Sequence, residues 1–238
     1  MTETFVALLL AHALADFVLQ PDRMAANKGR PGWLALHIGL VLALAVAATG
    51  TWSPWLLWLA AAHLGIDLVK LGWGDRLGPF LADQAAHLAS LGMVASTVPA
   101  LWESGIWARQ DLVPPGVLAL AILHAAGLIL AIRAGAFALR KLLAPLAITD
   151  PDGALGQGYP LAGRMIGQLE RGLTYLLVMV GQPMGVAFLV AAKSVLRFEA
   201  TSTDRRAAEY VLIGTLASVG WALVAGYAAM ALAGRLDP

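Results

Sequence analysis

The chain has 238 residues, of which 59% are hydrophobic and 13% are charged, and its mean hydropathy is +0.74. This composition excludes an ordinary soluble domain and predicts an all-α, polytopic membrane protein. The formal net charge of +1 gives no argument for a nucleic-acid partner. Because cysteine is absent, thiolate metal sites, disulfides and cysteine nucleophiles are excluded, and histidine and carboxylates remain as metal ligands.

Apolar runs divide the first half of the chain into five expected helices. A spanning helix needs about 20 mostly apolar residues, and Pro, Gly and Trp punctuate these runs. The first run is interpreted as a retained helix, because Glu3 precedes it where a signal peptide would be basic. The expected helices cover about residues 3–20, 31–50, 54–71, 79–98 and 115–133, the last with an amphipathic extension that carries Arg140 and Lys141.

A linker rich in Gly, Pro and Asp, at about residues 145–162, precedes three further expected helices. These cover about residues 163–180, 183–199 and 205–233, and the first two are separated by a tight break at Gly181-Gln182-Pro183. The total is about eight transmembrane helices. We expect residues 1–112 and 113–238 to be the two parts of one compact domain.

The distribution of basic residues predicts the orientation, since cytoplasmic loops collect Lys and Arg. With the N-terminus outside, the outer side receives only Arg109 and Arg235. The inner side then receives Arg23, Lys28, Arg30, Lys70, Arg76, Arg140, Lys141, Arg164, Arg205 and Arg206. We therefore expect a multi-pass protein with both termini outside.

A histidine pattern occurs twice in the first four expected helices. His12-x-x-x-Asp16 is followed by His37, and His63-x-x-x-Asp67 is followed by His87. The offsets between corresponding residues are 51, 51 and 50 positions. This repetition predicts a duplicated N-terminal two-helix hairpin that carries a polar cluster.

The six repeated residues are expected to lie in one layer, roughly 6–12 Å from the cytoplasmic ends of their helices. Residues four apart share a helix face, so each His/Asp pair can offer an imidazole and a carboxylate to one centre. Such ligands suit zinc, or iron or manganese, and the set could hold one or two ions. Asp83, one turn before His87, is the expected general base or bridging ligand. Interhelical hydrogen bonding is the alternative role, but each carboxylate at depth costs roughly 3 kcal/mol or more.

A second charged set lies toward the cytoplasmic ends of the last three helices. Its members are Glu170, Arg171, Lys193, Arg197 and Glu209. A structural role is favoured, because basic residues near helix ends extend to the interface and pair with nearby carboxylates. The alternative hypothesis is a substrate-binding pocket in which Arg and Lys hold a phosphate or carboxylate.

Over about residues 8–90 the sequence resembles a bacterial inner-membrane family catalogued as a domain of unknown function. The motifs that carry the resemblance are His12-x-x-x-Asp16-Phe17-x-x-Gln20, Asn27-Lys28, His63-x-x-x-Asp67 and Asp83-Gln84-x-x-His87. Segments from Gly163 to Arg171, Ala192 to Phe198 and Glu209 to Thr215 look like the C-terminal part of longer members. The resemblance implies a helical fold in the inner (cytoplasmic) membrane and supplies no reaction.

The leading functional hypothesis is a metal-dependent hydrolase or transferase that acts on a lipid or phosphoester at the cytoplasmic leaflet. The first alternative is a transporter in which the cluster passes protons or a divalent cation. The second is a redox protein with haem held by histidines, which carboxylates beside the imidazoles disfavour. The oligomeric state is not predicted.

Overall fold

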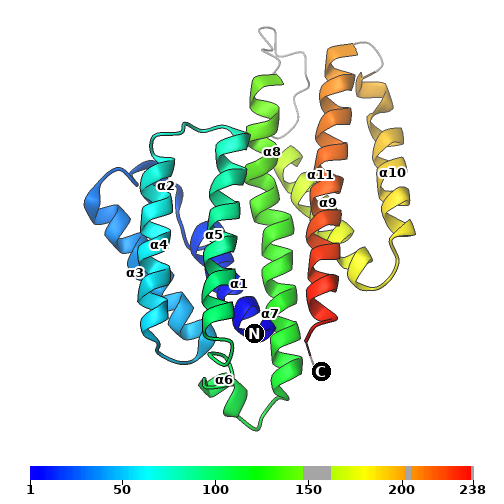
Figure 1. The fold of residues 1–238 in the computed structure, drawn as a ribbon. Helices are drawn as coiled ribbons and strands as arrows, with labels where there is room; N and C mark the ends of the chain where they lie inside the picture. Colours follow the sequence, from blue (N-terminus) through cyan, green and yellow to red (C-terminus); the bar gives the residue numbers. More distant parts are fainter. Residues whose placement is uncertain (147–161, 202–204, 237–238) are drawn as a thin grey trace. The chain divides into compact units, whose positions relative to one another are not determined.

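The structure, a computed structural model, describes residues 1–146, 162–201 and 205–236 and is helical, with no strand among those residues. Figure 1 shows several long helices together with the short helices α2 and α6. The chain divides into two compact units. Unit 1 comprises Met1–Ile129 with Ala231–Pro238, and unit 2 comprises Leu130–Met230.

Unit 1 is organised around its first helix. Its elements are α1 (Thr2–Phe17), α2 (Asp22–Ala26), α3 (Pro31–Thr49), α4 (Pro54–Lys70), α5 (Leu77–Thr97), α6 (Ile106–Arg109) and α7 (Pro115–Ile129). Helix α1 contacts α3, α5 and α7, and α4 contacts both α3 and α5. Eleven of the 16 residues of α1 are buried, so this helix forms the core of the unit.

Local sequence signals set the ends of these helices. Pro31 and Pro54 open α3 and α4, at positions where the missing N–H costs nothing. Ser53 caps α4 by accepting a hydrogen bond from Trp55 N at 3.3 Å. Gly50 ends α3 with φ +66°, and a Cβ there would lie 2.7 Å from the Trp107 ring, so both backbone and space require glycine.

Unit 2 follows α7 in the chain and is helical as well. Its elements are the π-helical turn η1 (Leu130–Ala134), α8 (Gly135–Leu143), η2 (Ala144–Leu146), α9 (Ala162–Met179), α10 (Met184–Thr201) and α11 (Arg205–Ala233), whose last residues belong to unit 1. The expected amphipathic extension after residue 133 is helical. Most of the expected linker, residues 147–161, lies outside the described residues.

The long helices occupy the expected ranges, with differences at two helix ends and with two short helices, α2 and α6, that the sequence did not predict. The first helix stops at Phe17, three residues before its expected end at Gln20. A short helix, α2, lies in the segment that follows. The fourth expected helix begins at Leu77, two residues before Pro79, because proline is tolerated within the first turn.

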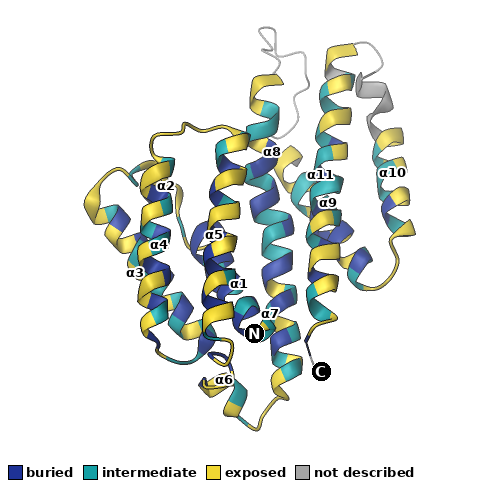
Figure 2. Ribbon diagram, viewed as in Figure 1, coloured by how far each residue is buried: buried dark blue, intermediate teal, exposed yellow. Residues whose placement is uncertain are grey.

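Within the described residues, three helical stretches are long and apolar enough to cross a membrane. They are Pro31–Thr49, Pro115–Leu146 and Ala208–Ala233. In each stretch, only 22–28% of the residues in its apolar 18-residue segment are buried inside the protein. Figure 2 shows the matching exposed surface along α3 and α11. Apolar helices left uncovered in this way are consistent with a membrane protein in contact with lipid.

The other long helices do not reach this threshold by length and composition alone. Helices α1 and α4 have 16 and 17 residues, which is short for a spanning segment. Helix α5 is long enough, but Asp83, Gln84 and His87 lower its hydropathy. Of the eight expected spans, three therefore have the length and composition of a membrane-crossing helix among the described residues, and the count of eight stays a prediction.

Candidate metal centre

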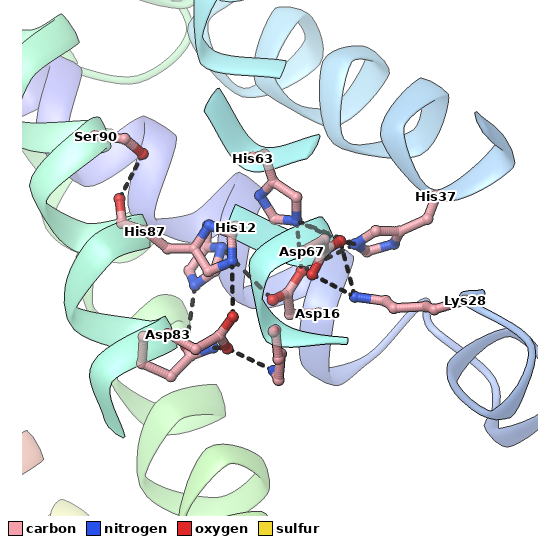
Figure 3. A network of polar contacts seen from close by, with 11 residues as sticks. His12, Asp16, Lys28, His37, His63, Asp67, Asp83, His87 and Ser90 are labelled. Atoms are coloured by element: carbon pink, nitrogen blue, oxygen red, sulfur yellow. Dashed lines mark hydrogen bonds and ion pairs between the residues drawn. The ribbon is translucent and has the colours of Figure 1, made fainter. Parts of the chain in front are cut away.

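Seven buried side chains from four helices of unit 1 face one another (Figure 3). They are His12 and Asp16 of α1, His37 of α3, His63 and Asp67 of α4, and Asp83 and His87 of α5. None is more than 9% exposed. Six of the seven form three pairs spaced four residues apart, which puts the two members of each pair on one helix face. The structure thus brings together all seven residues that the sequence predicted as metal ligands or general base.

The tightest set is Asp16, His37 and His63, from three different helices. His37 Nε2 and His63 Nε2 are 3.1 Å apart, and Asp16 Oδ1 lies 3.4 and 3.5 Å from them. Two ligand atoms bound at roughly 2.0–2.1 Å to one tetrahedral zinc ion lie about 3.3 Å apart. The three atoms therefore have the spacing of one face of a tetrahedral metal site.

Asp67 lies beside the same two imidazoles. Its Oδ2 is 3.5 Å from His37 Nε2 and 3.6 Å from His63 Nε2. The Lys28 ammonium donates to both carboxylate oxygens of Asp67, at 2.9 and 3.0 Å. Asp67 is therefore held by a lysine on one side and faces the histidines on the other.

His87 connects this set to the remaining residues. In two further groups, His12–His63–His87 and Asp67–Asp83–His87, one ligand atom from each residue lies within 4.8 Å of the others. His87 Nε2 is 3.5 Å from Asp83 Oδ1. Since His63 and His87 each belong to two groups, the cluster is continuous and has enough ligands for one ion or two.

Asp83 and His12 are positioned by polar side chains at the edge of the cluster. Lys70 Nζ and Gln84 Nε2 both donate to Asp83 Oδ2, the latter at 3.0 Å. Gln84 Oε1 lies 3.2 Å from His12 Nε2 and accepts a hydrogen bond when that nitrogen is protonated. Gln84 thus links an aspartate and a histidine that come from different helices.

The three carboxylates of the cluster face only two lysines. Lys28 neutralises Asp67, and Lys70 neutralises Asp83. Among the described residues, Asp16 has only histidines within ion-pair distance. If all four imidazoles are neutral, one buried negative charge lacks a counter-charge. A buried carboxylate requires a nearby positive charge, which a bound cation or a proton on an imidazole would supply.

Several atoms of the cluster are buried without a hydrogen-bond partner among the described residues. These include the Nδ1 atoms of His37 and His87, and also Asp16 Oδ1 and Asp83 Oδ1, which face imidazole nitrogens only at 3.4–3.5 Å. Leaving a buried polar atom unsatisfied costs about 1–3 kcal/mol. Carboxylate oxygens and imidazole nitrogens are the atoms that zinc, iron and manganese bind, so the orphaned atoms fit a metal ion.

The C-terminal charged set lies in unit 2, and its described members are paired within that unit. Lys193 Nζ donates to Glu170 Oε2 at 2.6 Å, and Arg205 donates to Glu209 at 2.9 Å on an exposed surface. Arg171, 5% exposed, donates to the carbonyl oxygen of Ile132 and to Ser218 Oγ. The side chain of Arg197 lies outside the described residues.

Lys28, Lys70 and Gln84 contact the cluster, although the sequence reasoning did not place them in the site. Lys28 and Lys70 looked like interfacial basic residues, and each instead pairs with a buried aspartate. The motifs of the family resemblance gave a usable signal, because they include Asn27-Lys28 and Asp83-Gln84.

The structure is thus a helical protein that is consistent with a place in a membrane, and its N-terminal unit has His/Asp groups able to hold a metal ion. Residues 4–110 match the model of a family described as "Protein of unknown function (DUF3307)". This match includes every residue of the cluster, and it confirms the resemblance to a domain of unknown function. No curated protein and no solved structure is similar enough to match the chain.

Proposed function

We propose that the protein is a metal-dependent hydrolase or transferase that acts on a lipid or phosphoester at the cytoplasmic leaflet of a bacterial inner membrane. The observation that carries the proposal is the Asp16–His37–His63 set, whose ligand atoms lie 3.1–3.5 Å apart in a buried position. Burying charge and imidazole at this density is expensive unless an ion or a reaction uses them.

Each part of the cluster has a role in this proposal. The six repeated His and Asp residues hold one or two divalent ions, zinc or iron or manganese. A bound metal ion lowers the pKa of a water molecule toward neutrality and polarises a phosphoryl or carbonyl oxygen. Asp83 accepts the proton of the attacking water. Lys70 forms an ion pair with Asp83, and because its side chain is one-third exposed it connects that carboxylate to the surface.

The membrane arrangement is part of the proposal. Eight helices cross the membrane, both termini lie outside, and residues 1–112 form the functional part. The first two hairpins are a duplicated pair. Corresponding histidine pairs support this duplication, because the His12–His87 ring centroids are 5.0 Å apart and the His63–His37 centroids 5.1 Å.

Metal analysis of the purified protein tests the metal centre. We expect wild-type protein to contain stoichiometric metal and His63→Ala to lose it, because His63 belongs to two of the three ligand groups. His124→Ala is the matched control, since His124 lies on α7 outside those groups. Absence of metal from the wild type, or equal metal content in both variants, would refute the proposal.

A transporter of protons or a divalent cation is the second candidate. The four imidazoles support it, because they form a continuous row in which successive ring centroids are 5.0, 4.0 and 5.1 Å apart from His12 through His87 and His63 to His37. Rows of titratable groups can relay protons through membrane proteins. Flux measured in proteoliposomes separates the candidates, since the hydrolase should show none. The same close ring spacing disfavours haem, because a porphyrin does not fit between neighbouring rings.

The proposed anion pocket in unit 2 has less support. Lys193 and Glu170 neutralise each other, and Glu209 is satisfied by an exposed arginine. These contacts favour the structural role for the set. Substrate binding by Arg171, Lys193 and Arg197 stays a prediction.

A further inference from the structure

A groove of about 470 Å³ lies between α4 and α5, beside the candidate metal centre. Small residues make room for it, namely Ala62 and Gly65 on α4 and Ala82 and Ala86 on α5. A Cβ added to Gly65 would meet nothing within 4 Å, so the groove is open at this position. Its volume is within the range of sites that bind small molecules, about 300–1,000 Å³.

The polar groups of the groove are concentrated at one end. Along α4 the lining changes from alanine and glycine to Lys70, the last residue of the helix. Eight residues separate Ala62 from Lys70, which is roughly 12 Å along the helix. The groove therefore has a long apolar wall and one polar end, where Lys70 is paired with Asp83.

Asp83 connects this groove to the metal centre. It lines the groove, it lies opposite Lys70, and it belongs to one of the groups that could hold an ion. A molecule in the groove would thus place its polar end at residues of the proposed reaction site. Lys70 is one-third exposed, and its ammonium keeps N–H donors beyond the one that Asp83 accepts. An apolar wall with such a donor at its end suits an amphiphile whose headgroup carries phosphate oxygens.

We propose that the groove binds one acyl chain of an anionic phospholipid, with the headgroup phosphate at Lys70 and next to Asp83. The surrounding bilayer supplies this ligand without any further carrier. The assignment names the substrate class of the proposed hydrolase and in that respect rests on the proposed function. Lipid binding itself depends only on the groove and on Lys70.

Photo-crosslinking in vesicles tests the acyl-chain site. The probe is phosphatidylglycerol with a photoactivatable diazirine in its acyl chain, and cross-linked peptides are mapped by mass spectrometry. We expect cross-links on the α4 and α5 groove residues in the wild type and their loss in Gly65→Leu, which fills the groove. Gly39→Leu on α3 is the matched control, because Gly39 is also exposed with no atom within 4 Å of an added Cβ.

The headgroup is tested with phosphatidylcholine that carries the same acyl probe. We expect the anionic lipid to cross-link about fivefold more, in line with one basic residue near an anionic group, and Lys70→Gln to abolish this preference. Equal labelling of the two lipids by the wild type would overturn the anionic assignment. Ala86→Leu is a second groove-filling variant if Gly65→Leu fails to fold.

Metal content measured on the same samples separates the two proposals. Groove-specific cross-links in protein without metal would refute the metal function and retain the lipid site. Metal-loaded protein whose cross-links are spread evenly, or are unchanged in both groove-filling variants, would refute the lipid site and retain the metal function.

Discussion

The two charged regions of the chain differ in how their polar atoms are satisfied. In unit 1, carboxylates and imidazoles converge, and several of their atoms lack hydrogen-bond partners among the described residues. In unit 2, Lys193 pairs with Glu170, and Arg171 donates to protein oxygens on neighbouring helices. In unit 1, carboxylate and imidazole atoms remain available to bind an ion. In unit 2, the donors of Lys193 and Arg171 are already bonded to protein oxygens. A buried charged cluster therefore indicates a binding site only where some of its carboxylate or imidazole atoms have no bonding partner within the protein.

The π-helical turn explains why unit 2 needs its arginine. A π-helical turn widens the helix and changes its hydrogen-bond pattern, so that carbonyl groups become available. Arg171 donates to Ile132 O at 3.1 and 3.3 Å, and Trp221 Nε1 donates to Leu130 O at 3.0 Å. Gly135 leaves space for this contact, since a Cβ there would lie 2.9 Å from Arg171 Cδ. Arg171 thus stabilises the irregular turn.

The largest expected effect is loss of metal affinity in Asp16→Ala. Asp16 supplies an atom of the tightest set and is the one cluster carboxylate with no lysine within ion-pair distance among the described residues. Because even outer partners of metal ligands are worth 10–100-fold, removal of this ligand should weaken metal binding by about 100-fold or more. Titration against a chelating dye measures the affinity. Asp22→Ala, at an exposed aspartate of α2, should leave it unchanged, and equal affinities in the two variants would contradict the assignment.

The second effect is destabilisation by Lys28→Met. Lys28 is the counter-charge of Asp67, whose side chain is 1% exposed. Removing one partner of a buried ion pair costs roughly 3–5 kcal/mol, because the other charge is left buried and alone. Thermal unfolding in detergent should show this loss in chelator-treated protein and a smaller loss with zinc present, since the ion compensates the carboxylate.

The double variant Lys28→Met/Asp67→Asn controls for lost packing contacts of the lysine side chain. It should recover most of the stability of the metal-free protein, because no uncompensated charge remains. A double variant as unstable as Lys28→Met alone would show that the ion pair is not the cause.

The third effect distinguishes the regions directly. Arg171→Met leaves the Ile132 carbonyl and the Ser218 hydroxyl without their donor, which should lower the free energy of unfolding by about 1–3 kcal/mol. Metal content should stay at the wild-type level, because the ligand groups all lie in unit 1. Chemical denaturation and metal analysis on one sample measure both quantities. Metal loss with unchanged stability would reverse the roles given to the two regions.

The sequence predicted the helices and the cluster because both depend on local spacing. Pro31 and Pro54 mark the starts of their helices whatever those helices pack against. A four-residue interval likewise puts His63 and Asp67 on one helix face. The repeat at intervals of 50 and 51 residues then suggested that the faces meet. These signals required no knowledge of the tertiary arrangement.

The partners of the cluster could not be predicted in the same way. A lysine side chain near a helix end can extend to solvent or reach a neighbouring helix, and only the tertiary arrangement decides between them. Lys28 reaches Asp67 across 39 positions, and Lys70 reaches Asp83 on the next helix. The π-helical turn was also missed, because no apolar periodicity distinguishes one wide turn inside a long apolar helix.

The smallest expected effect is that of Glu209→Gln. This variant tests whether the exposed part of the C-terminal charged set is only structural. Glu209 pairs with Arg205 four residues earlier, and the two side chains are 59% and 92% exposed. Exposed ion pairs contribute little to stability, because solvent screens the attraction and ordering both side chains costs entropy. We expect no measurable change in unfolding temperature or in metal content. Glu3→Gln is the control for a measured turnover of an anionic lipid. If Glu209→Gln abolished this turnover and Glu3→Gln did not, the C-terminal set would belong to a binding site. Charged residues whose hydrogen bonds are all made within the protein could then no longer be taken as purely structural.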